Sequence, residues 1–507
     1  MRLELRGRSI SLARALVVVA SLVPIAVYLY VALHRIGYPY ELEWLEGGAV
    51  EIVRRVAEGQ AIYVQPSVHY VPYPYTPLYF WVSGALAHVT GVGFLPLRLV
   101  SLLSSLGCCA VLIRIVWRET GDLVAGILAS GLFTATFAVS GAWFDIGRVD
   151  SFSLLLLLLA ISAARRAETI SRGIGVGVLV FLAFMAKQDT LIATAPVLVL
   201  LIVIKRRAGA AALTATVALV VGSTAVLNAT THDWYGYYVF DELAHQGLTG
   251  SAWTTFFTRS LLHEPWALML GLAGLAVAVV LRRREGTTDW LFWSVAVGGL
   301  LASSLVSRLH SGGGPDVLMP AFAGVAIFGA LGYDVLRREA AWLGADGSTG
   351  PLGRGRQVAA ACLAAVVAVQ IVALHYDPAR YIPSAADQVA GDRFIALVRH
   401  TPGAVIVADH PYYDTLAGKT SWAQGEALHD IVRAGPSVAR RDLLASIESF
   451  LKSSQRATVF SDDPGSALGA SSLPYFRRST VKVFACRNCF YPVTDIRVRP
   501  GFLFVRR

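Results

Sequence analysis

Long apolar runs, each about as long as a membrane is thick, constrain the fold of this chain more than any other feature. The hydrocarbon core of a bilayer is about 30 Å thick, so a helix that rises 1.5 Å per residue needs roughly 20 apolar residues to cross it. In lipid the backbone must satisfy its own hydrogen bonds, which makes a helix the expected form of each run. We therefore predict a polytopic α-helical membrane protein with about 11 transmembrane helices. The runs, three of them short, are Ala13–Leu33, Leu97–Trp117, Leu123–Ala142, Ser151–Ala164, Ile174–Ala186, Leu191–Ile204, Ala210–Leu227, Pro265–Leu281, Trp290–Val306, Val317–Leu336 and Val358–His375.

The charged residues support a membrane protein. Only 15% of the residues are charged and 55% are hydrophobic, whereas about 25% of a soluble domain is charged. The net charge of +10 would suit nucleic acid in a soluble chain. Here, however, Lys and Arg gather in short clusters between the apolar runs, as they do in the cytoplasmic loops of membrane proteins. The membrane is therefore the expected partner, and nucleic acid is not.

The basic clusters fall in alternate loops, and they set the predicted orientation. Placing all of them in the cytoplasm puts the N-terminus inside and the tail after about His375 outside. The first run is too long for a signal peptide and lacks a small-residue cleavage site, so we predict a multi-pass protein of the plasma (inner) membrane. The clusters are Arg6 and Arg8, Arg114 and Arg118, Arg165 and Arg166, Lys205–Arg207, Arg282–Arg284, and Arg337, Arg338, Arg354 and Arg356.

Two domains are predicted from the point where the apolar runs stop. Residues 1–375 form a transmembrane domain with a long first outer loop at residues 35–96, and residues 376–507 form a small extracytoplasmic α/β domain. A Gly-rich cytoplasmic linker at Gly344–Arg356 precedes the last run. The tail has β-like runs at Ala404–Ala408, Ala457–Phe460 and Val481–Ala485 and a helical stretch at Arg440–Lys452.

Three acids stand close together in the first outer loop. Glu41, Glu43 and Glu46 lie within six residues, just beyond the first run. Glu43 and Glu46 share a face if the segment is helical, and Glu46–Gly59 has the apolar spacing of an amphipathic helix at the membrane interface. A carboxylate here suits a general base that takes a proton from an attacking hydroxyl, and Glu43 and Glu46 are our candidates. For Glu41 we favour the alternative, a solvated loop acid or a partner of the arginines at positions 54 and 55.

Cations are predicted on the same side of the membrane as these acids. Arg148 stands at the outer start of the fourth run, beside Asp145 and Asp150. Charges at this depth are costly unless they are paired or functional. Arg148 suits bidentate binding of a phosphate, and pairing with either neighbouring acid is the equal alternative.

Lys187 breaks the positive-inside pattern, because our topology places its turn outside. We favour phosphate binding for Lys187, with a salt bridge to Asp189 or Asp150 as the alternative. Tyr75, in the Pro-rich segment Pro72–Tyr79, suits the interface and supports the same site.

Further polar side chains in two outer loops are candidate contacts for phosphate or sugar. Arg259 precedes the eighth run, and Arg308 and His310 lie in a Gly-rich turn that ends at Asp316. A local structural role is the alternative that we favour for each of them. Cys486 and Cys489 form a CxxC motif, with two residues between them. A local disulfide is favoured over a zinc site, because no second CxxC motif occurs in the sequence.

Taken in order, these segments resemble the GT-C superfamily of integral membrane glycosyltransferases, and most of all the bacterial relatives of protein O-mannosyltransferases and aminoarabinose transferases (family 39-like). The resemblance is carried by Glu46-Gly-Gly with the Tyr/Pro segment Pro72–Tyr79, by Gly147-Arg-Val-Asp150 and by Phe184-Met-Ala-Lys187-Gln-Asp. It covers roughly Ala13–Lys205 in sequence and the rest by topology.

The resemblance implies a polyprenyl-phosphate-sugar donor, inversion at the sugar, and a base from the first outer loop. Glu43 and Glu46 would take the positions of the loop acids of the family, and Arg148 and Lys187 would face the donor phosphate. The spacing Glu-x-Glu-x-x-Glu departs from the adjacent Asp-Glu pair of some members, which leaves both acids open as the base. No cofactor is required by the sequence, although some relatives use a divalent metal; no metal ligand set is predicted.

The expected function is therefore transfer of a hexosyl or pentosyl group from the lipid donor to a glycan, lipid or protein acceptor at the outer face of the membrane. A lipid or solute transporter is the alternative. It would place ionisable groups near the middle of the membrane, in discontinuous helices. Here most charges gather at one rim, which favours an enzyme. A non-catalytic binding protein is the third possibility.

Overall fold

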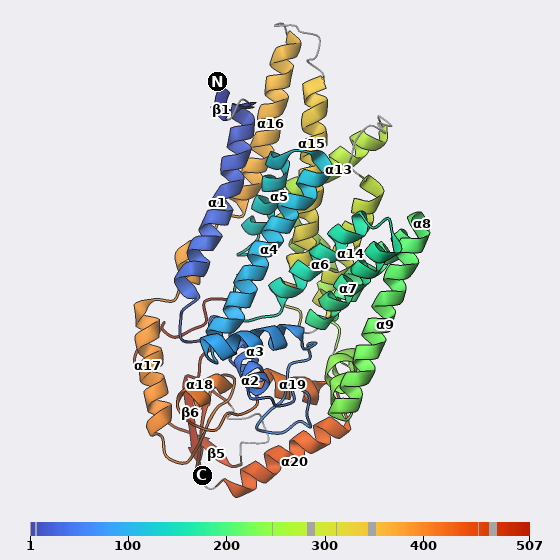
Figure 1. Cartoon of the computed structure of the whole chain (residues 1–507). Helices are drawn as coiled ribbons and strands as arrows, with labels where there is room; N and C mark the ends of the chain where they lie inside the picture. Colours follow the sequence, from blue (N-terminus) through green and yellow to red (C-terminus); the bar gives the residue numbers. More distant parts are fainter. Residues whose placement is uncertain are drawn as a thin grey trace.

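The structure is a computed structural model, and it describes residues 2–5, 8–245, 247–280, 289–310, 312–342, 351–454, 456–465 and 474–507. A helix bundle makes up most of the molecule, and a smaller mixed unit from the end of the chain packs on one end of it (Figure 1). We call this the loop end of the bundle. A helix lies on each of the eleven apolar runs: α1 (Leu12–Arg35), α4 (Phe94–Thr120), α5 (Leu123–Ala135), α6 (Asp150–Arg165), α7 (Ile170–Ala186), α8 (Thr190–Ile204), α9 (Arg206–Thr231), α13 (Pro265–Val280), α14 (Trp290–Leu309), α15 (Met319–Trp342) and α16 (Pro351–Ala373).

Not every one of these helices is long enough to cross a membrane alone. Among the described residues, five helical segments have the length and composition of a span: Leu12–Arg35, Phe94–Thr120, Arg206–Thr231, Trp290–Leu309 and Pro315–Ala340. Two bent helix pairs raise the number to as many as seven. Shorter apolar helices, α5, α7 and α8, pack among the long ones. The chain is thus a multi-pass membrane protein in architecture, while a total of eleven spans stays a prediction.

Some predicted boundaries are wrong or untested. The run Leu123–Ala142 is helical only to Ala135, and the chain then turns through a non-helical segment to α6. The predicted linker Gly344–Arg356 is helical from Pro351, where α16 begins; its first part, like Arg6 and Arg282–Arg284, lies outside the described residues. Pro351 at the first helical position fits the start of α16, because proline has no backbone N–H and the first residue of a helix has no helical partner for one.

Small residues bring two bundle helices into close contact. Gly173 and Gly177 lie one turn apart on α7 and face α9. A methyl group added at Gly173 would stand 2.2 Å from the carbonyl oxygen of Ala208, and one at Gly177 would stand 2.6 Å from that of Ala212. In lipid, where apolar helices gain little from hydrophobic burial, such close packing of small residues is a main source of helix association.

The first loop forms a layer across the loop end of the bundle. Helix α2 (Glu46–Ala57) and helix α3 (Leu78–Thr90) lie there, between the bundle and the C-terminal unit (Figure 1). The amphipathic helix predicted at Glu46–Gly59 is confirmed, but its apolar face is covered by protein. Val50 and Val53 are fully buried in a cluster with side chains of α3 and of the C-terminal unit.

The C-terminal unit contains a four-stranded sheet of order β3-β4-β6-β5. Strand β3 pairs parallel with β4, and β6 pairs antiparallel with both β4 and β5. The strands are β3 (Ala404–Val407), β4 (Ala457–Ser461), β5 (Phe476–Arg478) and β6 (Phe502–Arg506), and the helices are α17 (Ala385–His400), α18 (Pro411–Leu416), α19 (Gly425–Arg433) and α20 (Val438–Ser453).

Two of the predicted β-like runs are strands and one is not. Ala404–Ala408 and Ala457–Phe460 coincide with β3 and β4, and Arg440–Lys452 lies within α20. Val481–Ala485 forms no strand. The sheet is completed instead by β5, which has only three residues, two of them arginine, and by β6, a short apolar run that ends in arginine. Neither strand has the apolar alternation that identifies a half-buried strand.

The remaining described elements are short. They are β1 (Arg2–Leu5) and β2 (Arg8–Ser11), α10 (Trp234–Gly236), η1 (Tyr237–Asp241), α11 (Glu242–His245), α12 (Gly250–Thr255), η2 (Phe256–Ser260), η3 (Leu261–His263), η4 (Pro315–Leu318) and η5 (Pro378–Tyr381).

The contact between α7 and α9 gives a paired prediction on one helix. Gly173→Ala should lower the thermal unfolding temperature of the purified protein in detergent, because the new methyl group meets the α9 backbone; overpacking of this kind costs about 1–3 kcal/mol. Gly175 has nothing within 4 Å of an added methyl group, so Gly175→Ala should leave the temperature unchanged or raise it. Equal effects of the two substitutions would contradict the observed packing.

Candidate functional site

A cavity of about 640 Å³ opens at the loop end of the bundle. Its walls come from six parts of the chain: the first loop, the segment before α6, the turn between α7 and α8, residues 240 and 243 between α9 and α13, the end of α14 with the Gly-rich turn, and the C-terminal unit. Its polar and charged lining residues are Tyr73, Tyr75, Arg148, Lys187, Gln188, Asp189, Ser307, His310, Asp316, Glu426, Asp430 and Asp495. The predicted meeting of acids and cations at one end of the molecule is therefore observed.

Glu46 is the structural anchor of this region. Its carboxylate pairs with Arg98 of α4, with distances of 2.7 Å to Nη2 and 3.0 Å to Nε. It also accepts hydrogen bonds from the backbone N–H of Leu42 at 2.7 Å and of Gly147 at 2.6 Å. Both side chains are fully buried. Burial alone would raise the pKa of Glu46, but the Arg98 guanidinium and the two backbone donors outweigh it and hold this pKa below its usual value.

This geometry does not support Glu46 as the general base. All its hydrogen-bonding capacity is used, and a carboxylate that is stabilised in its charged form is a weak proton acceptor. Arg98 in turn donates to the carbonyl oxygens of Tyr38 and Tyr40, each at 2.6 Å. The pair therefore holds the turn at residues 38–46 against α4 and against the segment before α6.

Glu43 has the opposite environment. It is fully buried, and neither of its carboxylate oxygens accepts a well-formed hydrogen bond from another described residue. Burial raises the pKa of Glu43 well above its usual value, against the opposing effects of the Arg148 guanidinium and the Leu45 N–H. The next two residues, Trp44 and Leu45, line the cavity. A buried carboxylate without a partner, beside a cavity, is suited to accept a proton from a bound molecule.

Glu41 differs from the prediction. It is neither solvated nor paired with the arginines at positions 54 and 55. It contacts Nδ1 of His410, whose Nε2 lies 3.1 Å from Asp462. Burial raises the pKa of Glu41 to about 7, and His410 opposes this rise. The buried imidazole between two carboxylates fastens the first loop to the C-terminal unit.

Arg148 presents an unusual guanidinium to the cavity. Its Nη2 donates to the hydroxyl of Tyr75 at 3.0 Å, and its centre lies 4.9 Å from the ring of Trp143 and 5.5 Å from those of Tyr73 and Tyr75. Its buried Nε and Nη1 have no hydrogen-bond partner among the described residues. Aromatic rings thus fix the plane of the guanidinium while two donors remain for an oxyanion.

Neither predicted ion pair of Arg148 occurs among the described residues. Asp145 pairs instead with Arg35 of α1, at 2.6 Å, and both side chains are buried. Asp150 pairs with Lys187, at 2.8 Å. The alternative of a local salt bridge therefore fails for Arg148 and holds for Lys187.

Lys187 is both paired and exposed to the cavity. Besides Asp150, its ammonium group lies 3.6 Å from Asp189 Oδ2, which accepts a hydrogen bond of 2.9 Å from Ser307. An ammonium group has three donors and can hold a ligand oxygen in addition to these acids. Asp150 and Asp189 thus hold the Lys187 ammonium group in the cavity wall, and their supporting role in a reaction stays a prediction.

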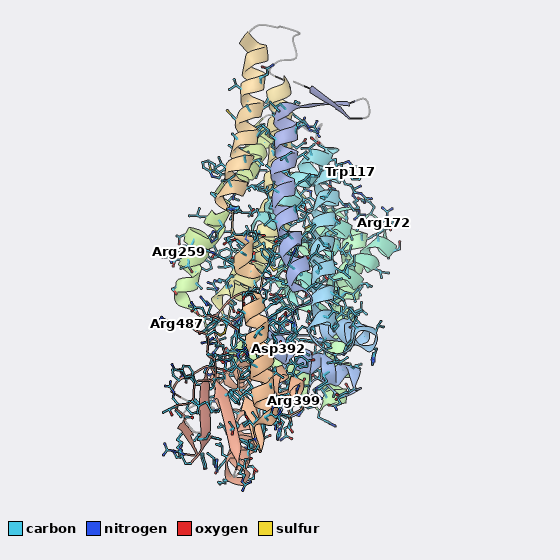
Figure 2. The ribbon with its side chains drawn as sticks, turned by 90° about the vertical axis from the view of Figure 1, so that its left-hand side faces the viewer. Trp117, Arg172, Arg259, Asp392, Arg399 and Arg487 are labelled. Carbon is cyan, nitrogen blue, oxygen red and sulfur yellow. A yellow bond between two sulfur atoms is a disulfide. The ribbon has the colours of Figure 1, made fainter. Side chains whose placement is uncertain are left out.

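Of the three other predicted contacts for phosphate or sugar, the structure brings one to the cavity and leaves two away from it. His310 lines the cavity, and its Nδ1 is buried without a hydrogen-bond partner among the described residues. Arg308 does not line it; its guanidinium donates to the carbonyl of Gly313 and so closes the Gly-rich turn. Arg259 lies exposed on the surface of η2, away from the cavity lining (Figure 2). Arg259 and Arg308 are therefore not brought to the site.

Several residues of the region were missed by the sequence analysis. Arg98 could have been predicted, because it is the second residue of the apolar run Leu97–Trp117 and a charge in such a run requires a partner or a function. Asp495, Glu426 and Asp430 come from the C-terminal unit, and nothing local in the sequence indicates that they reach the cavity. Within the described residues, no group of three or more His, Cys, Asp or Glu side chains is arranged to hold a metal ion.

Comparison with known proteins adds to this geometry. Residues 72–231 match the family described as dolichyl-phosphate-mannose-protein mannosyltransferase. The crystal structure of ArnT from Cupriavidus metallidurans bound to undecaprenyl phosphate aligns over 96% of this chain and 97% of that chain, at 14% identity and a TM-score of 0.60. Its apo state aligns over the same shares at 14% identity and a TM-score of 0.58. No curated protein sequence matches. The predicted resemblance to GT-C glycosyltransferases of the ArnT and protein mannosyltransferase type is confirmed.

The saturated pair at Glu46 leads to a stability prediction. Glu46→Gln should lower the free energy of unfolding by about 3–5 kcal/mol, because it leaves the buried Arg98 charge uncompensated. Thermal or denaturant unfolding of the purified protein in detergent measures this change. Replacing both residues, as Glu46→Gln with Arg98→Met, should recover part of the loss.

The matched control for this prediction is Glu58→Gln at the end of the same helix. Glu58 forms an exposed pair with Arg54, and exposed pairs contribute little to stability. If Glu46→Gln were no more destabilising than Glu58→Gln, the anchoring role of Glu46 would be refuted.

Proposed function

From the likeness to GT-C membrane glycosyltransferases, we propose that this chain transfers a glycosyl group from a polyprenyl-phosphate-linked donor to an acceptor hydroxyl at the outer face of the membrane. The observation that carries the proposal is a buried carboxylate, Glu43, directly before the cavity-lining residues Trp44 and Leu45 and within electrostatic reach of the cavity-lining guanidinium of Arg148. Among the described residues, neither the carboxylate oxygens of Glu43 nor Nε and Nη1 of Arg148 have a hydrogen-bond partner. The ArnT structure of the same fold holds undecaprenyl phosphate, a molecule of the proposed donor class.

The proposed donor matches the surroundings of the cavity. Its lipid chain belongs among the apolar helices, and its phosphate belongs at their rim, where Arg148, Lys187 and His310 line the wall. Arg148 and Lys187 stabilise the negative charge that grows on the leaving phosphate. The Tyr75 hydroxyl, which accepts a hydrogen bond from Arg148, keeps the guanidinium in place.

The reaction step follows from these positions. The acceptor oxygen attacks the anomeric carbon and forms the new glycosidic bond while the bond from that carbon to the phosphate oxygen breaks. The acceptor proton passes to Glu43, and the electron pair of the broken bond leaves with the lipid phosphate. Inversion at the anomeric carbon is expected from the resemblance. Glu46 acts through position alone, by holding the turn that carries Glu43.

The outer location rests on the distribution of basic residues. The clusters at positions 114–118 and 165–166 lie at the end of the bundle opposite the cavity, as do Trp117 and Arg172 in Figure 2. Because basic residues are typical of the cytoplasmic side, this distribution supports our proposal that the cavity and the C-terminal unit face the outside of the plasma membrane. The transferred group is proposed to be a hexose or pentose, and the acceptor a glycan, lipid or protein.

The first test concerns Glu43. In proteoliposomes that contain polyprenyl-phosphate sugars, Glu43→Gln should lower kcat by about 10²- to 10⁴-fold, the usual range for loss of a general base, with little change in donor KM. Glu58→Gln is the matched control and should keep full turnover. Undiminished turnover in Glu43→Gln would remove Glu43 as the base, and movement of intact donor across the bilayer without covalent change would favour the transporter.

The pH dependence of the reaction tests the same assignment. A base must be deprotonated to act, and burial raises the pKa of Glu43 above its usual value near 4.5. The rate should therefore fall as the pH is lowered through a pKa above 4.5, and this acid limb should be absent from the residual activity of Glu43→Gln. An acid limb that persists unchanged in Glu43→Gln would assign the titration to another group.

The phosphate site is tested by matched arginine substitutions. Arg148→Lys keeps the charge but loses the planar pair of donors and the stacking, so kcat/KM for the donor should fall at least about tenfold, as expected for the loss of one charge-assisted hydrogen bond. Arg259→Lys, at an exposed position away from the cavity, should keep the value of the parent protein. Equal values for the two variants would contradict a role of Arg148 in holding phosphate.

A further inference from the structure

A second cavity, of about 870 Å³, lies on the C-terminal unit and is strongly basic. Residues 474–507 contain eight Lys and Arg and a single acid, Asp495. Five of these cations line the cavity, which we call the basic groove: Arg478, Lys482, Arg487, Arg497 and Arg499. The one acid in its lining, Asp462, is hydrogen-bonded to His410.

The cations of the groove are not neutralised by neighbours. Among the described residues, none of the five lies within ion-pair distance of a carboxylate, whereas cations elsewhere on the same unit are paired, as in Arg433 with Glu426 and Lys452 with Glu448. Closely spaced like charges repel one another, so a folded domain gains from an anion that binds among them. The positive charge of the groove therefore favours the binding of an anion.

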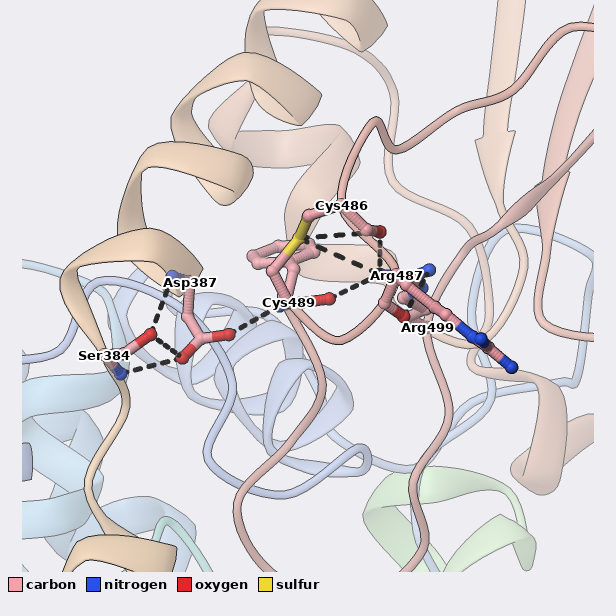
Figure 3. The surroundings of a disulfide bond; sticks show 7 residues. Ser384, Asp387, Cys486, Arg487, Cys489 and Arg499 are labelled. Atoms are coloured by element: carbon pink, nitrogen blue, oxygen red, sulfur yellow. Dashed lines mark hydrogen bonds between the residues drawn. A yellow bond between two sulfur atoms is a disulfide. The ribbon is translucent and has the colours of Figure 1, made fainter.

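The groove also has a rigid frame. Arg499 donates to the carbonyl oxygens of Cys489 at 2.5 Å and of Cys486 and Arg487 at 3.3 Å, and it stacks on the rings of Phe484 and Tyr491. The Cys486–Cys489 disulfide, as favoured from the sequence, closes the same turn (Figure 3). Arg499 and the disulfide together fix the turn from which the side chain of Arg487 extends.

Two further guanidinium groups are held by aromatic rings. Arg478 lies 4.5 Å from the ring centre of Phe502, and Arg497 lies 4.8 Å from that of Tyr491. A guanidinium stacked on a ring keeps its N–H edge free for a carboxylate or phosphate, which it binds through two parallel hydrogen bonds. Because the side chain is already ordered, binding costs less conformational entropy.

The groove adjoins the candidate active site along the chain. Asp495 and Ile496 line the cavity with Arg148 and Lys187, and the next residues, Arg497 to Arg499, line the groove. Five consecutive residues thus run from the wall of the cavity to the wall of the groove. A second link runs from Asp462 in the groove through His410 to Glu41 in the first loop.

We propose that the basic groove binds an anionic saccharide, one that carries carboxylate or phosphate groups, as part of the acceptor. The description of this saccharide as the acceptor rests on the proposed function; binding in the groove does not. With its charged residues in the groove, such an acceptor reaches past residues 495–499 to present a hydroxyl in the cavity, beside the segment that carries Glu43.

Binding to the detergent-solubilised full chain tests the proposal. The probes are fluorescent trigalacturonate, fluorescent maltotriose 6-phosphate and neutral fluorescent maltotriose, with fluorescence anisotropy as the readout. At least one charged probe should bind at least about tenfold more tightly than the neutral probe, and Arg487→Glu with Arg497→Glu should weaken it at least about tenfold. Affinity should also fall between about 0.1 M and about 1 M salt, as the screening length drops from about 10 Å to about 3 Å.

Matched variants separate charge from folding. Arg393→Glu changes an exposed cation on α17, outside the groove, and should bind the probes like the parent protein. Arg487→Gln with Arg497→Gln should show an intermediate loss with an unchanged thermal unfolding temperature, because only the backbone carbonyl of Arg487 takes part in the turn.

Three results would overturn the proposal. The neutral probe could bind as tightly as the charged probes, or Arg393→Glu could weaken binding as much as the groove variants do. Saturable binding of phosphatidylglycerol nanodiscs through the same arginines, with no binding of the saccharides, would instead assign the groove to a lipid surface. The proposed function fails separately. Glu43→Gln should keep full probe binding while it loses turnover, and a parent protein that binds the probes without any transfer would leave the groove assigned and the reaction refuted.

Discussion

The buried ion pair between Glu46 and Arg98 joins three segments on which the site depends: the first loop, helix α4 and the segment before α6. Removing two charges from water costs several kcal/mol for each ion, and the cost is offset only where geometry and additional hydrogen bonds are favourable. Here two backbone N–H groups complete the carboxylate and two backbone carbonyls complete the guanidinium. Because all of these partners must be present together, the pair fixes one arrangement of the loop end.

This arrangement gives different roles to side chains of the same type. Glu46 is saturated and held in its charged form, while Glu43, three residues earlier, is buried and accepts no well-formed hydrogen bond from the residues that the structure describes. The pKa values of the two carboxyl groups are shifted in opposite directions. The same contrast separates Arg98, whose donors are used, from Arg148, which keeps two donors free. The proposed phosphosugar transfer would use this division, because a fixed frame would then hold an acid and an oxyanion site that are both incompletely satisfied.

Much of the fold was predictable because a lipid environment leaves a chain few choices. Each apolar run became a helix, and α2 was visible in the spacing of its apolar residues. At the cavity, Arg148, Lys187 and His310 line the wall as the sequence predicted, and Glu43 directly precedes the lining residues Trp44 and Leu45; the catalytic roles of these side chains stay predictions. Arg259 and Arg308 have the same chemistry, but Arg308 donates to the carbonyl of Gly313 and Arg259 lies exposed on η2. The contribution of Asp495 depends on how the C-terminal unit packs on the first loop, and contacts over more than 400 residues leave no local pattern.

The central claim is that the first loop and the C-terminal unit share one non-cytoplasmic face, and thiol accessibility in spheroplasts tests it most directly. In a protein with Cys108, Cys109 and Cys362 replaced by alanine, one cysteine at a time is introduced at an exposed position: Gln60, Arg441 or Arg118. Labelling with a membrane-impermeant maleimide then shows on which side of the membrane each position lies. The account predicts labelling at Gln60 and Arg441 in intact spheroplasts, and at Arg118 only after lysis. Labelling of Arg118 in intact spheroplasts with protection of Gln60 would invert the molecule, and opposite accessibility of Gln60 and Arg441 would separate the proposed acceptor groove from the cavity.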